Sequence, residues 1–275
     1  MTVAELLIYG KSKIHSDISK ILLAELLSYN PLEMLNHLEE TVEEDIIEKY
    51  KKEVEAILNN EPMQYVIGNV NFYGNKFYID KRVLIPRFET EELVENTIEY
   101  VNKYFDEPID IIDLGCGSGN IGITLEKKLN VSKLDLVDIS TDALEVAKIN
   151  IKNLNSKANI LQNDMLDNII NKYDLIISNP PYIKEDEEIE EIVKNNEPHL
   201  ALYAKEDGLF FYKKILKNVK KNLKDRSIIA FEIGSDEKDD IIKIIREELP
   251  NSQIITKKDL QQRDRMIFIF NGINL

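Results

Sequence analysis

The sequence predicts an α/β fold in which a mostly parallel sheet carries helices on both faces, preceded by a small helical region and a β-hairpin. From about residue 109 onward, short apolar runs alternate with amphipathic segments, which is typical of parallel strands joined by helices. Residues 1–62 show helical periodicity, whereas residues 63–85 are rich in β-forming side chains and interrupted by glycine. We therefore expect a helical domain at 1–62, a hairpin linker at 63–85 and an α/β domain at 86–275.

The first region is expected to be a bundle of roughly four short helices. Asn30 and Pro31 are typical of a helix N-cap and its first turn, and Thr41 with Glu44 resembles a capping box. The helix that follows should end before Pro62. One helical face is expected to carry Ile18, Ile21, Leu22 and Leu26.

The next stretch should form one or two hairpins that link the two bodies. The segment from Tyr65 to Ile79 is rich in Val, Ile, Phe and Tyr, and Gly68 and Gly74 supply its turns. A helix is then predicted over residues 91–104.

The remaining elements are predicted from alternating strand and helix patterns. Strands are expected at residues 109–114, 133–138, 158–162, 173–178, 227–233, 253–256 and 266–270. Helices are expected at residues 120–129, 142–153, 208–222 and 236–248.

Net charge, cysteine count and the length of apolar runs restrict the partners and compartment that we expect for this protein. The net charge is −15, which disfavours binding to a phosphate backbone and leaves room for a basic protein partner. Cys116 is the one cysteine, so the chain has no internal disulfide. No apolar run approaches the length of a membrane span, and we expect a cytoplasmic protein without membrane, stable nucleic-acid or metal partners.

A glycine-rich loop follows the strand at 109–114 and opens the next helix, as at many nucleotide sites. Two details favour S-adenosyl-L-methionine over a dinucleotide. The loop begins with Asp113, which suits a cationic amino group better than a pyrophosphate, and its spacing is Gly-x-Gly-x-Gly. The expected cofactor-binding residues of this loop are Asp113, Gly115, Cys116, Gly117, Ser118 and Gly119.

Three further positions extend this predicted site. Asp138 ends the next strand, where a carboxylate accepts hydrogen bonds from ribose hydroxyls. Asp164 is a candidate acceptor for the adenine amino group, and Met165 a candidate for packing on the adenine face. The alternative is that the glycines are turns and the aspartates are caps.

The tetrapeptide Asn179-Pro180-Pro181-Tyr182 follows the apolar strand at 173–178. Its two prolines stiffen the turn, as suits a site that holds a reacting atom. An amide or aromatic-amine nitrogen is a poor nucleophile, because its lone pair is delocalised. The side-chain oxygen of Asn179 and the carbonyl of Pro180 can accept its N–H groups and localise that lone pair, while Tyr182 offers a flat face. Methyl transfer to a planar nitrogen is the chemistry this arrangement predicts, with Asn179 bordering the cofactor as well.

These motifs resemble the class I methyltransferase fold, and the chain as a whole resembles the release factor glutamine methyltransferase family (the HemK/PrmC type). The resemblance is carried by residues 61–68, 72–74, 84–93, 113–120, 138–140, 179–182, 197–198, 201–202, 207–209, 232–234 and 259–265. It implies methylation of the glutamine N5 in the Gly-Gly-Gln motif of class 1 peptide chain release factors, with S-adenosyl-L-homocysteine as the second product. It also implies that the helical domain grips the release factor, and that Pro181, Arg87 and Glu89 contact substrate.

Three other functions fit part of the sequence. A ribosomal-protein glutamine methyltransferase would share both motifs, although the stretch from Arg87 to Glu91 favours the release-factor branch. Adenine N6 methylation of a nucleic acid also presents a planar nitrogen, but the chain has no basic recognition region. A non-catalytic binding module is disfavoured, because the loop glycines, Asp138 and Asn179 are all present.

Overall fold

The computed structural model describes residues 1–275, and the chain divides into two compact units. One unit comprises residues 1–69 and 190–196, and the other comprises residues 70–189 and 197–275. The boundary between residues 69 and 70 lies inside the stretch that we expected to be a linker. No helix is both long and apolar enough to cross a membrane.

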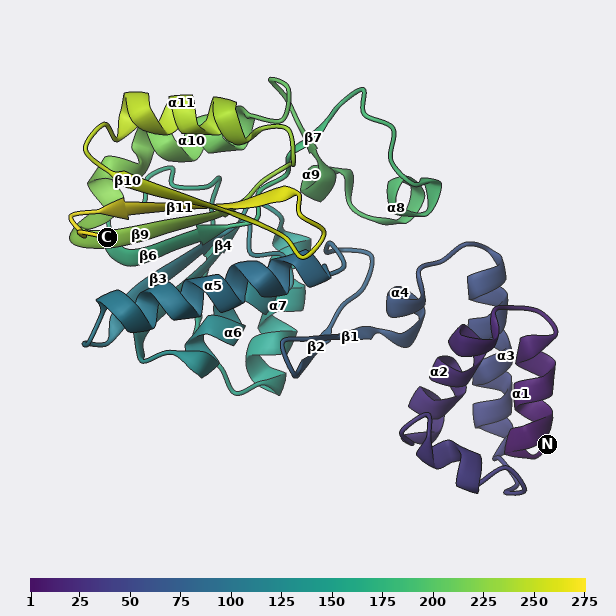
Figure 1. Ribbon diagram of the computed structural model, residues 1–275. Helices are drawn as coiled ribbons and strands as arrows, with labels where there is room; N and C mark the ends of the chain where they lie inside the picture. The colour runs from purple at the N-terminus through teal and green to yellow at the C-terminus, as the bar shows by residue number, and fades with distance from the viewer. The chain divides into compact units, whose positions relative to one another are not determined.

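The first unit is helical (Figure 1). Its elements are α1 (Val3–Lys11), α2 (Ser16–Leu27), the 3-10 helix η1 (Glu33–Asn36), α3 (Glu44–Leu58), α4 (Met63–Ile67) and α8 (Glu191–Asn196). Apolar side chains of the first four elements form a common core, including Leu6, Leu22, Met34 and Tyr50. The phenol of Tyr50 lies 2.8 Å from the hydroxyl of Ser19, so its buried oxygen is satisfied.

Two of the predicted helix starts are wrong. Thr41 forms an antiparallel bridge with Thr2, and α3 begins at Glu44 without a side-chain cap. The capping box lies instead at α1, between Thr2 and Glu5. The side chain of Asn30 accepts a hydrogen bond from Leu32 N at 2.9 Å, a local turn that leads into the short η1 rather than an α-helix.

The predicted strand at Tyr65–Ile67 is also wrong, because these residues lie in the one-turn helix α4. The amide of Tyr65 donates to the Pro62 carbonyl, and Gly68 ends the turn with φ +79°. Val66 and Ile67 pack against the helical core, so burial on a helix surface overrides their β-propensity.

The predicted hairpin forms just after α4. Strands β1 (Asn69–Phe72) and β2 (Asn75–Tyr78) pair across Tyr73 and Gly74, which both have positive φ. Phe72 and Phe77 are buried in an edge-to-face contact.

The second unit is built on a seven-stranded sheet with the order β10-β11-β9-β6-β3-β4-β5. Its strands are β3 (Ile109–Leu114), β4 (Val131–Asp138), β5 (Asn159–Gln162), β6 (Tyr173–Ser178), β9 (Leu223–Glu232), β10 (Gln253–Lys258) and β11 (Asp264–Asn271). All neighbours are parallel except β11, which runs antiparallel to both β9 and β10. The predicted fold class is thereby confirmed.

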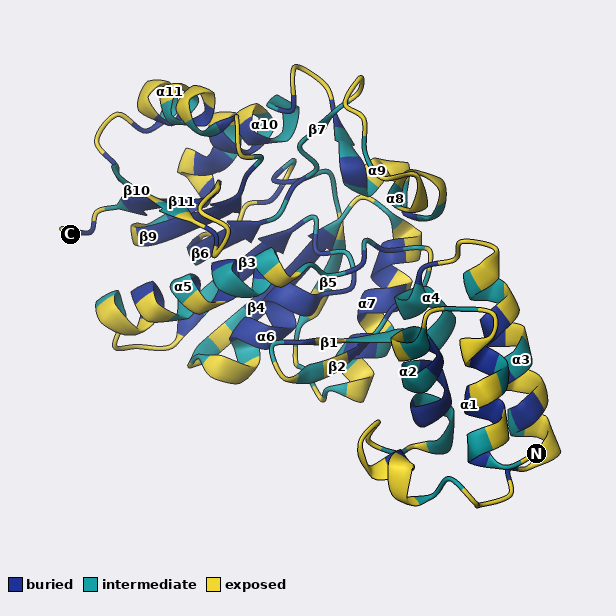
Figure 2. Cartoon of the chain, turned by 45° about the vertical axis from the view of Figure 1, so that its right-hand side comes forward, coloured by how far each residue is buried: buried dark blue, intermediate teal, exposed yellow.

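Helices cover both faces of this sheet; its inner strands are largely buried, whereas the edge strands β5 and β10 are partly exposed (Figure 2). One face packs on α5 (Phe88–Tyr104), α6 (Asn120–Lys128) and α7 (Thr141–Asn153), and the other on α10 (Phe210–Val219) and α11 (Lys238–Glu248). Shorter elements complete the unit: β7 (Ile183–Lys184), α9 (His199–Leu202), β8 (Tyr203–Ala204) and the 3-10 helix η2 (Lys220–Asn222).

Candidate active site

The candidate site lies where the strand order reverses. The first strand of the sheet, β3, pairs with β4 on one side and with β6 on the other. Leu114 is in register with Val137 of β4 and with Ser178 of β6. The next residues are Gly115, Asp138 and Asn179, so three predicted site residues leave adjacent strands at one edge. Ligands of open α/β sheets bind at this position.

A cavity of about 290 Å³ lies at this edge. Seven of the predicted residues line it: Gly115, Gly117, Asp138, Asp164, Met165, Asn179 and Pro181. The other lining residues are Arg82, Val83, Leu84, Ile139, Ser140, Ala143, Asn163, Pro198, Leu200, Ala201, Phe210 and Phe211. The cavity therefore combines a glycine-rich backbone wall and two carboxylates with a mostly apolar remainder.

The glycine loop turns on left-handed backbone. Gly115, Gly117 and Gly119 have φ values of +70°, +53° and +78°, which L side chains rarely adopt. The amides of Gly115 and Cys116 both donate to the Val137 carbonyl, at 2.8 and 2.9 Å, and tie the loop to β4. This geometry explains the glycine spacing and keeps bare backbone against the cavity.

Asp138 holds the loop while it faces the cavity. One carboxylate oxygen accepts from Gly117 N at 2.9 Å and the other from Ser140 N at 2.9 Å. Burial raises the pKa of Asp138, and the N–H donors of Ser140 and Gly117, with a smaller contribution from that of Ile139, oppose that shift. A carboxylate has about four acceptor positions, so capacity remains for two ligand hydroxyls.

Asp113 lies beneath the loop, outside the cavity lining. It is fully buried, and one of its oxygens accepts from Gly122 N at 2.9 Å while the other has no partner. Burial raises its pKa to about 7. The cavity shape thus does not support the expected direct contact between this carboxylate and a ligand amine. Cys116 and Ser118 are buried in the same layer, and burial raises the pKa of the Cys116 thiol, which disfavours a nucleophilic role.

Asp164 and Met165 also line the cavity. Asp164 is paired with Lys214 at 2.5 Å, and Met165 is 7% exposed with φ +53°. Both residues predicted to contact the adenine therefore line the cavity. The apolar Ile139, Phe210 and Phe211 that accompany them were not predicted, because no motif marks them.

The tetrapeptide after β6 divides between cavity and interior. Asn179 and Pro181 line the cavity, and Pro180 is buried. The Tyr182 hydroxyl lies 3.5 Å from a carboxylate oxygen of Glu232 and 3.4 Å from Nη1 of Arg265. Burial raises the pKa of Tyr182, so it stays a neutral phenol. The Tyr182 ring was expected to present a flat face to substrate, but the ring is not part of the cavity lining.

Sequence reasoning gave no role to Glu232, which lies behind Asn179. This carboxyl is 1% exposed and accepts a hydrogen bond from the Thr90 hydroxyl at 2.7 Å. The same hydroxyl lies 3.3 Å from Nδ2 of Asn179. The link joins α5, β9 and the end of β6, whose residues are far apart in sequence.

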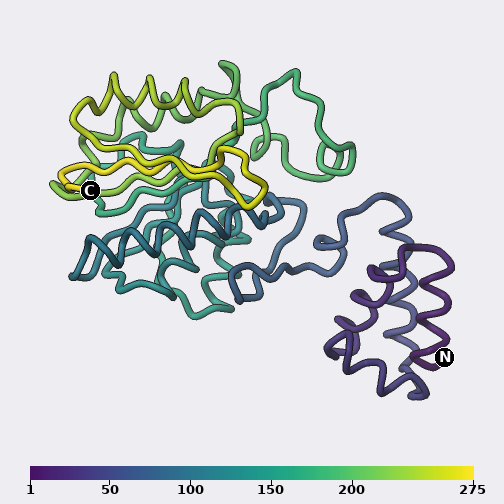
Figure 3. The backbone as a smooth tube through the Cα atoms, viewed as in Figure 1, coloured from purple at the N-terminus to yellow at the C-terminus, as the bar shows by residue number.

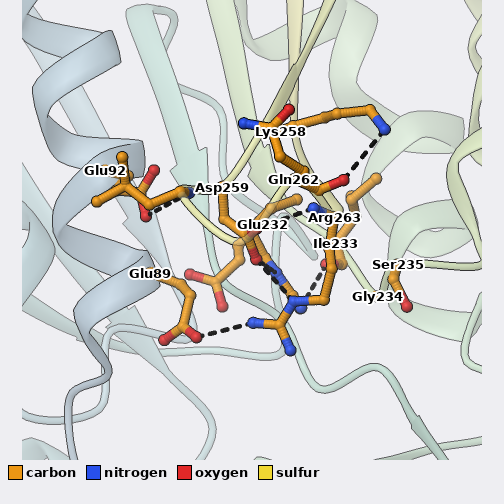
Figure 4. Close-up of polar contacts among 12 residues, drawn as sticks. Glu89, Glu92, Glu232, Ile233, Gly234, Ser235, Lys258, Asp259, Gln262 and Arg263 are labelled. Carbon is orange, nitrogen blue, oxygen red and sulfur yellow. Dashed lines mark hydrogen bonds and ion pairs between the residues drawn. The ribbon is translucent and has the colours of Figure 1, made fainter.

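Arg87 and Glu89, the other predicted substrate-binding residues, lie outside the cavity lining in ion pairs. Arg87 pairs at 2.5 Å with Glu197, which also accepts from Ile85 N. Glu89 pairs with Arg263 at 3.0 Å, in the loop between β10 and β11 (Figure 4). Leu260 N, in the same loop, donates to a carboxylate oxygen of Glu92 on α5. The path of the β10–β11 segment can be followed in Figure 3. The two ion pairs connect the start of α5 to Glu197 and to the loop between β10 and β11.

Comparison with known proteins places this site in a family. Residues 93–206 match the family described as Methyltransferase small domain, and residues 12–68 match the PrmC N-terminal domain. The chain is 34% identical over 255 residues to a release factor glutamine methyltransferase of Bacillus cereus, covering 90% of both chains. It is 37% identical over 263 residues to one of Clostridium acetobutylicum, covering 92% of this chain and 90% of the other.

Among solved structures, the 16S rRNA N2 G1207 methyltransferase of T. Thermophilus, in complex with AdoMet and guanosine, shares the fold. Its TM-score is 0.54 at 14% identity, over 74% of this chain and 49% of that one. The likeness to the Bacillus and Clostridium enzymes extends over both units, and the glycine loop, Asp138 and Asn179 lie together at one cavity. The chain belongs to the release factor glutamine methyltransferase family.

Proposed function

We propose that this enzyme transfers a methyl group from S-adenosyl-L-methionine to the side-chain N5 of the glutamine in the Gly-Gly-Gln motif of class 1 peptide chain release factors. The observation that carries the proposal is the position of Asn179. Its amide borders a cavity at the switch point of the sheet, after the strand that pairs with the one leading into the glycine loop, and Asp138 lines the same cavity after the strand on the other side. The family relationship selects the acceptor, since the site alone suits any planar nitrogen.

The residues at the cavity fit S-adenosyl-L-methionine. Asp138 has acceptor capacity left for the two ribose hydroxyls, and Ile139, Met165 and Phe210 offer an apolar setting for the adenine. The bare backbone at Gly115 and Gly117 allows close approach of the methionine part. When bound there, the cofactor supplies an electrophilic methyl group on a sulfonium. S-adenosyl-L-homocysteine is then the product that leaves.

The acceptor side of the site orients the amide rather than deprotonating it. Oδ1 of Asn179 accepts one N–H group of the substrate amide, which directs the nitrogen lone pair toward the methyl donor. The second expected acceptor, the carbonyl of Pro180, belongs to a buried residue outside the cavity lining. The nitrogen loses its proton to solvent after the N–C bond forms. Pro181 stiffens the turn and closes the cavity beside Asn179.

The helical region at 1–62 is proposed to grip the release factor, and its match to the PrmC N-terminal domain supports this division of labour. Arg87 and Glu89 are proposed to act at the rim of the acceptor site, through the segments that their ion pairs hold. Because the acceptor takes part in translation, we propose that the enzyme works in the cytoplasm.

The test is methyl transfer from labelled S-adenosyl-L-methionine to three acceptors: a class 1 release factor, a ribosomal large-subunit protein and duplex DNA. We expect label in the release factor alone, lost when the Gly-Gly-Gln glutamine is replaced by alanine. Asn179→Ala should abolish transfer and leave cofactor affinity within about twofold, since Asp138 and the glycine loop are untouched. Label in the ribosomal protein or in adenine would assign the other substrate class.

A further inference from the structure

An asparagine side chain has a donor end and an acceptor end, and only one of them suits the proposed reaction. Oδ1 accepts a substrate N–H, whereas Nδ2 would face the two amide hydrogens of glutamine with two hydrogens of its own. A rotation of 180° about the last side-chain bond exchanges the two ends. The site therefore needs a group that distinguishes them.

The hydroxyl of Thr90 is placed to distinguish the two ends of the Asn179 amide. The side chain lies in the first turn of α5 and is 2% exposed. Its single hydrogen is directed to Oε2 of Glu232 at 2.7 Å. The hydroxyl then has only lone pairs for a second neighbour, so it accepts from Nδ2 of Asn179 at 3.3 Å.

Glu232 determines which group donates and which accepts in these two hydrogen bonds. As a carboxylate it has no hydrogen to donate, so Thr90 must be the donor to it. The carboxyl is 1% exposed at the end of β9, and no direct ion pair neutralises it. Arg265 approaches it by way of Tyr182, and that guanidinium is bonded to the Ile233 carbonyl at 3.0 Å. Burial of a carboxyl that bonds mainly to one hydroxyl is costly, which argues for a use beyond holding β9 and α5 together.

We propose that Glu232 and Thr90 are positioning residues, which hold the Asn179 amide with Oδ1 toward the acceptor nitrogen. The inference rests on the proposed function, because it presupposes that Asn179 orients a substrate amide. Neither residue lines the cavity, so both act through Asn179.

The first test compares substitutions at Thr90. Thr90→Val keeps the shape of the side chain and removes the hydroxyl, so we expect kcat to fall about 10- to 100-fold. The KM for release factor and the affinity for S-adenosyl-L-methionine should change less than about threefold, because the loss is confined to the reacting geometry. Thr90→Ser keeps the hydroxyl and should retain most of the wild-type kcat.

Thr97→Val is the matched control. Thr97 is a fully buried threonine on the same helix, and its hydroxyl donates to the Leu93 carbonyl at 2.7 Å rather than toward the site. We expect Thr97→Val to leave kcat unchanged, even where it lowers the melting temperature. Should Thr90→Val not fold, Thr90→Ala against Thr90→Ser isolates the same hydroxyl.

The outcomes separate the two proposals. If Asn179→Ala is inactive while Thr90→Val keeps wild-type kcat, the positioning chain is wrong and the proposed function stands. If Asn179→Ala itself keeps its activity, the orienting role of Asn179 fails. An equal loss of kcat in Thr90→Ser and Thr90→Val would show that packing, not the hydroxyl, matters at this position.

Discussion

The side chains at the edge of the sheet serve two purposes at once. Asp138 accepts from two backbone amides, which shape the glycine loop, and still borders the cavity. Asn179 uses one end of its amide for Thr90 and leaves the other for a ligand. At the residue scale, the site therefore depends on which hydrogen-bond acceptors and donors have no partner within the protein.

Replacement of Asp138 tests the cofactor half of the site. Asp138→Ala removes the acceptor for the ribose hydroxyls and the support for Gly117, so we expect the Kd for S-adenosyl-L-methionine to rise about 10- to 100-fold. Isothermal titration calorimetry measures this directly. Asp142→Ala, an exposed position in the first turn of α7, is the control and should bind normally. An unchanged Kd in Asp138→Ala would remove Asp138 from the site.

The pH dependence tests the state of Glu232. Burial raises the pKa of this carboxyl to about 7. Below that pH the protonated carboxyl can donate a hydrogen bond to the Thr90 hydroxyl. The Thr90 hydrogen then points toward Asn179 and favours the flipped amide, whose Oδ1 accepts it. Oδ1 is then no longer available to the substrate N–H. The carboxyl is faced by Thr90 and Glu89 of α5, Arg265 of β11 and Tyr182.

We therefore expect kcat to rise with pH through about 7, because the carboxylate form is the active one. The glutamine amide of the substrate does not titrate in this range, so the rise of kcat with pH reflects a group of the enzyme. Glu232→Gln keeps an acceptor oxygen without a titrating proton and should flatten the limb in kcat–pH profiles measured from about pH 6 to 9. A limb that persists in Glu232→Gln belongs to another group.

At the scale of elements, the glycine loop depends on how closely α6 approaches the sheet. Gly122 on α6 donates to Asp113 of β3, and a Cβ at this position would lie 2.5 Å from Leu136 Cδ2 of β4. The helix that the loop opens is thus held against the two strands that carry Gly115 and Asp138. Substitutions here should affect stability first and the site second.

Gly122→Ala is expected to destabilise the protein by about 1–3 kcal/mol through overpacking, as measured by urea unfolding. Leu136→Val shortens the side chain that the new methyl group meets. The penalty of Gly122→Ala should therefore be smaller in a Leu136→Val background than in the wild type. An equal penalty in both backgrounds would place the clash elsewhere.

For the whole molecule, charge is the property that bears most on substrate encounter. The chain carries 50 acidic and 35 basic side chains, for a net charge of −15. An acceptor protein with a basic face would be attracted to this chain, and such attraction accelerates association. The same charge opposes approach of free nucleic acid, in keeping with a protein acceptor.

We expect the KM for release factor to rise severalfold as salt increases from about 0.05 to 0.3 M, while kcat stays constant, because salt screens exposed charges. Steady-state rates at each ionic strength measure this. An uncharged peptide that contains Gly-Gly-Gln is the control and should show a flat KM. A flat KM for the intact release factor would exclude electrostatic attraction as a source of affinity.

The sequence by itself determined the fold class, the succession of strands and helices after residue 109, and the edge at which Gly115, Asp138 and Asn179 meet. These depend on periodicity and on motifs a few residues long, and local chemistry encodes both. Only the tertiary structure decided that Asp113 lies beneath the loop, that Met63–Ile67 is helical, and that Thr90 joins Glu232 to Asn179.

The physical reason is separation along the chain. Thr90 lies 142 positions from Glu232 and 89 from Asn179, so no local pattern links them. Their hydrogen bonds exist because β9 and β6 pair in parallel, and because the first turn of α5 packs at the end of both strands. Asn179 was therefore visible in the sequence as a candidate site residue, but Thr90 and Glu232, which contact one another behind it, were not.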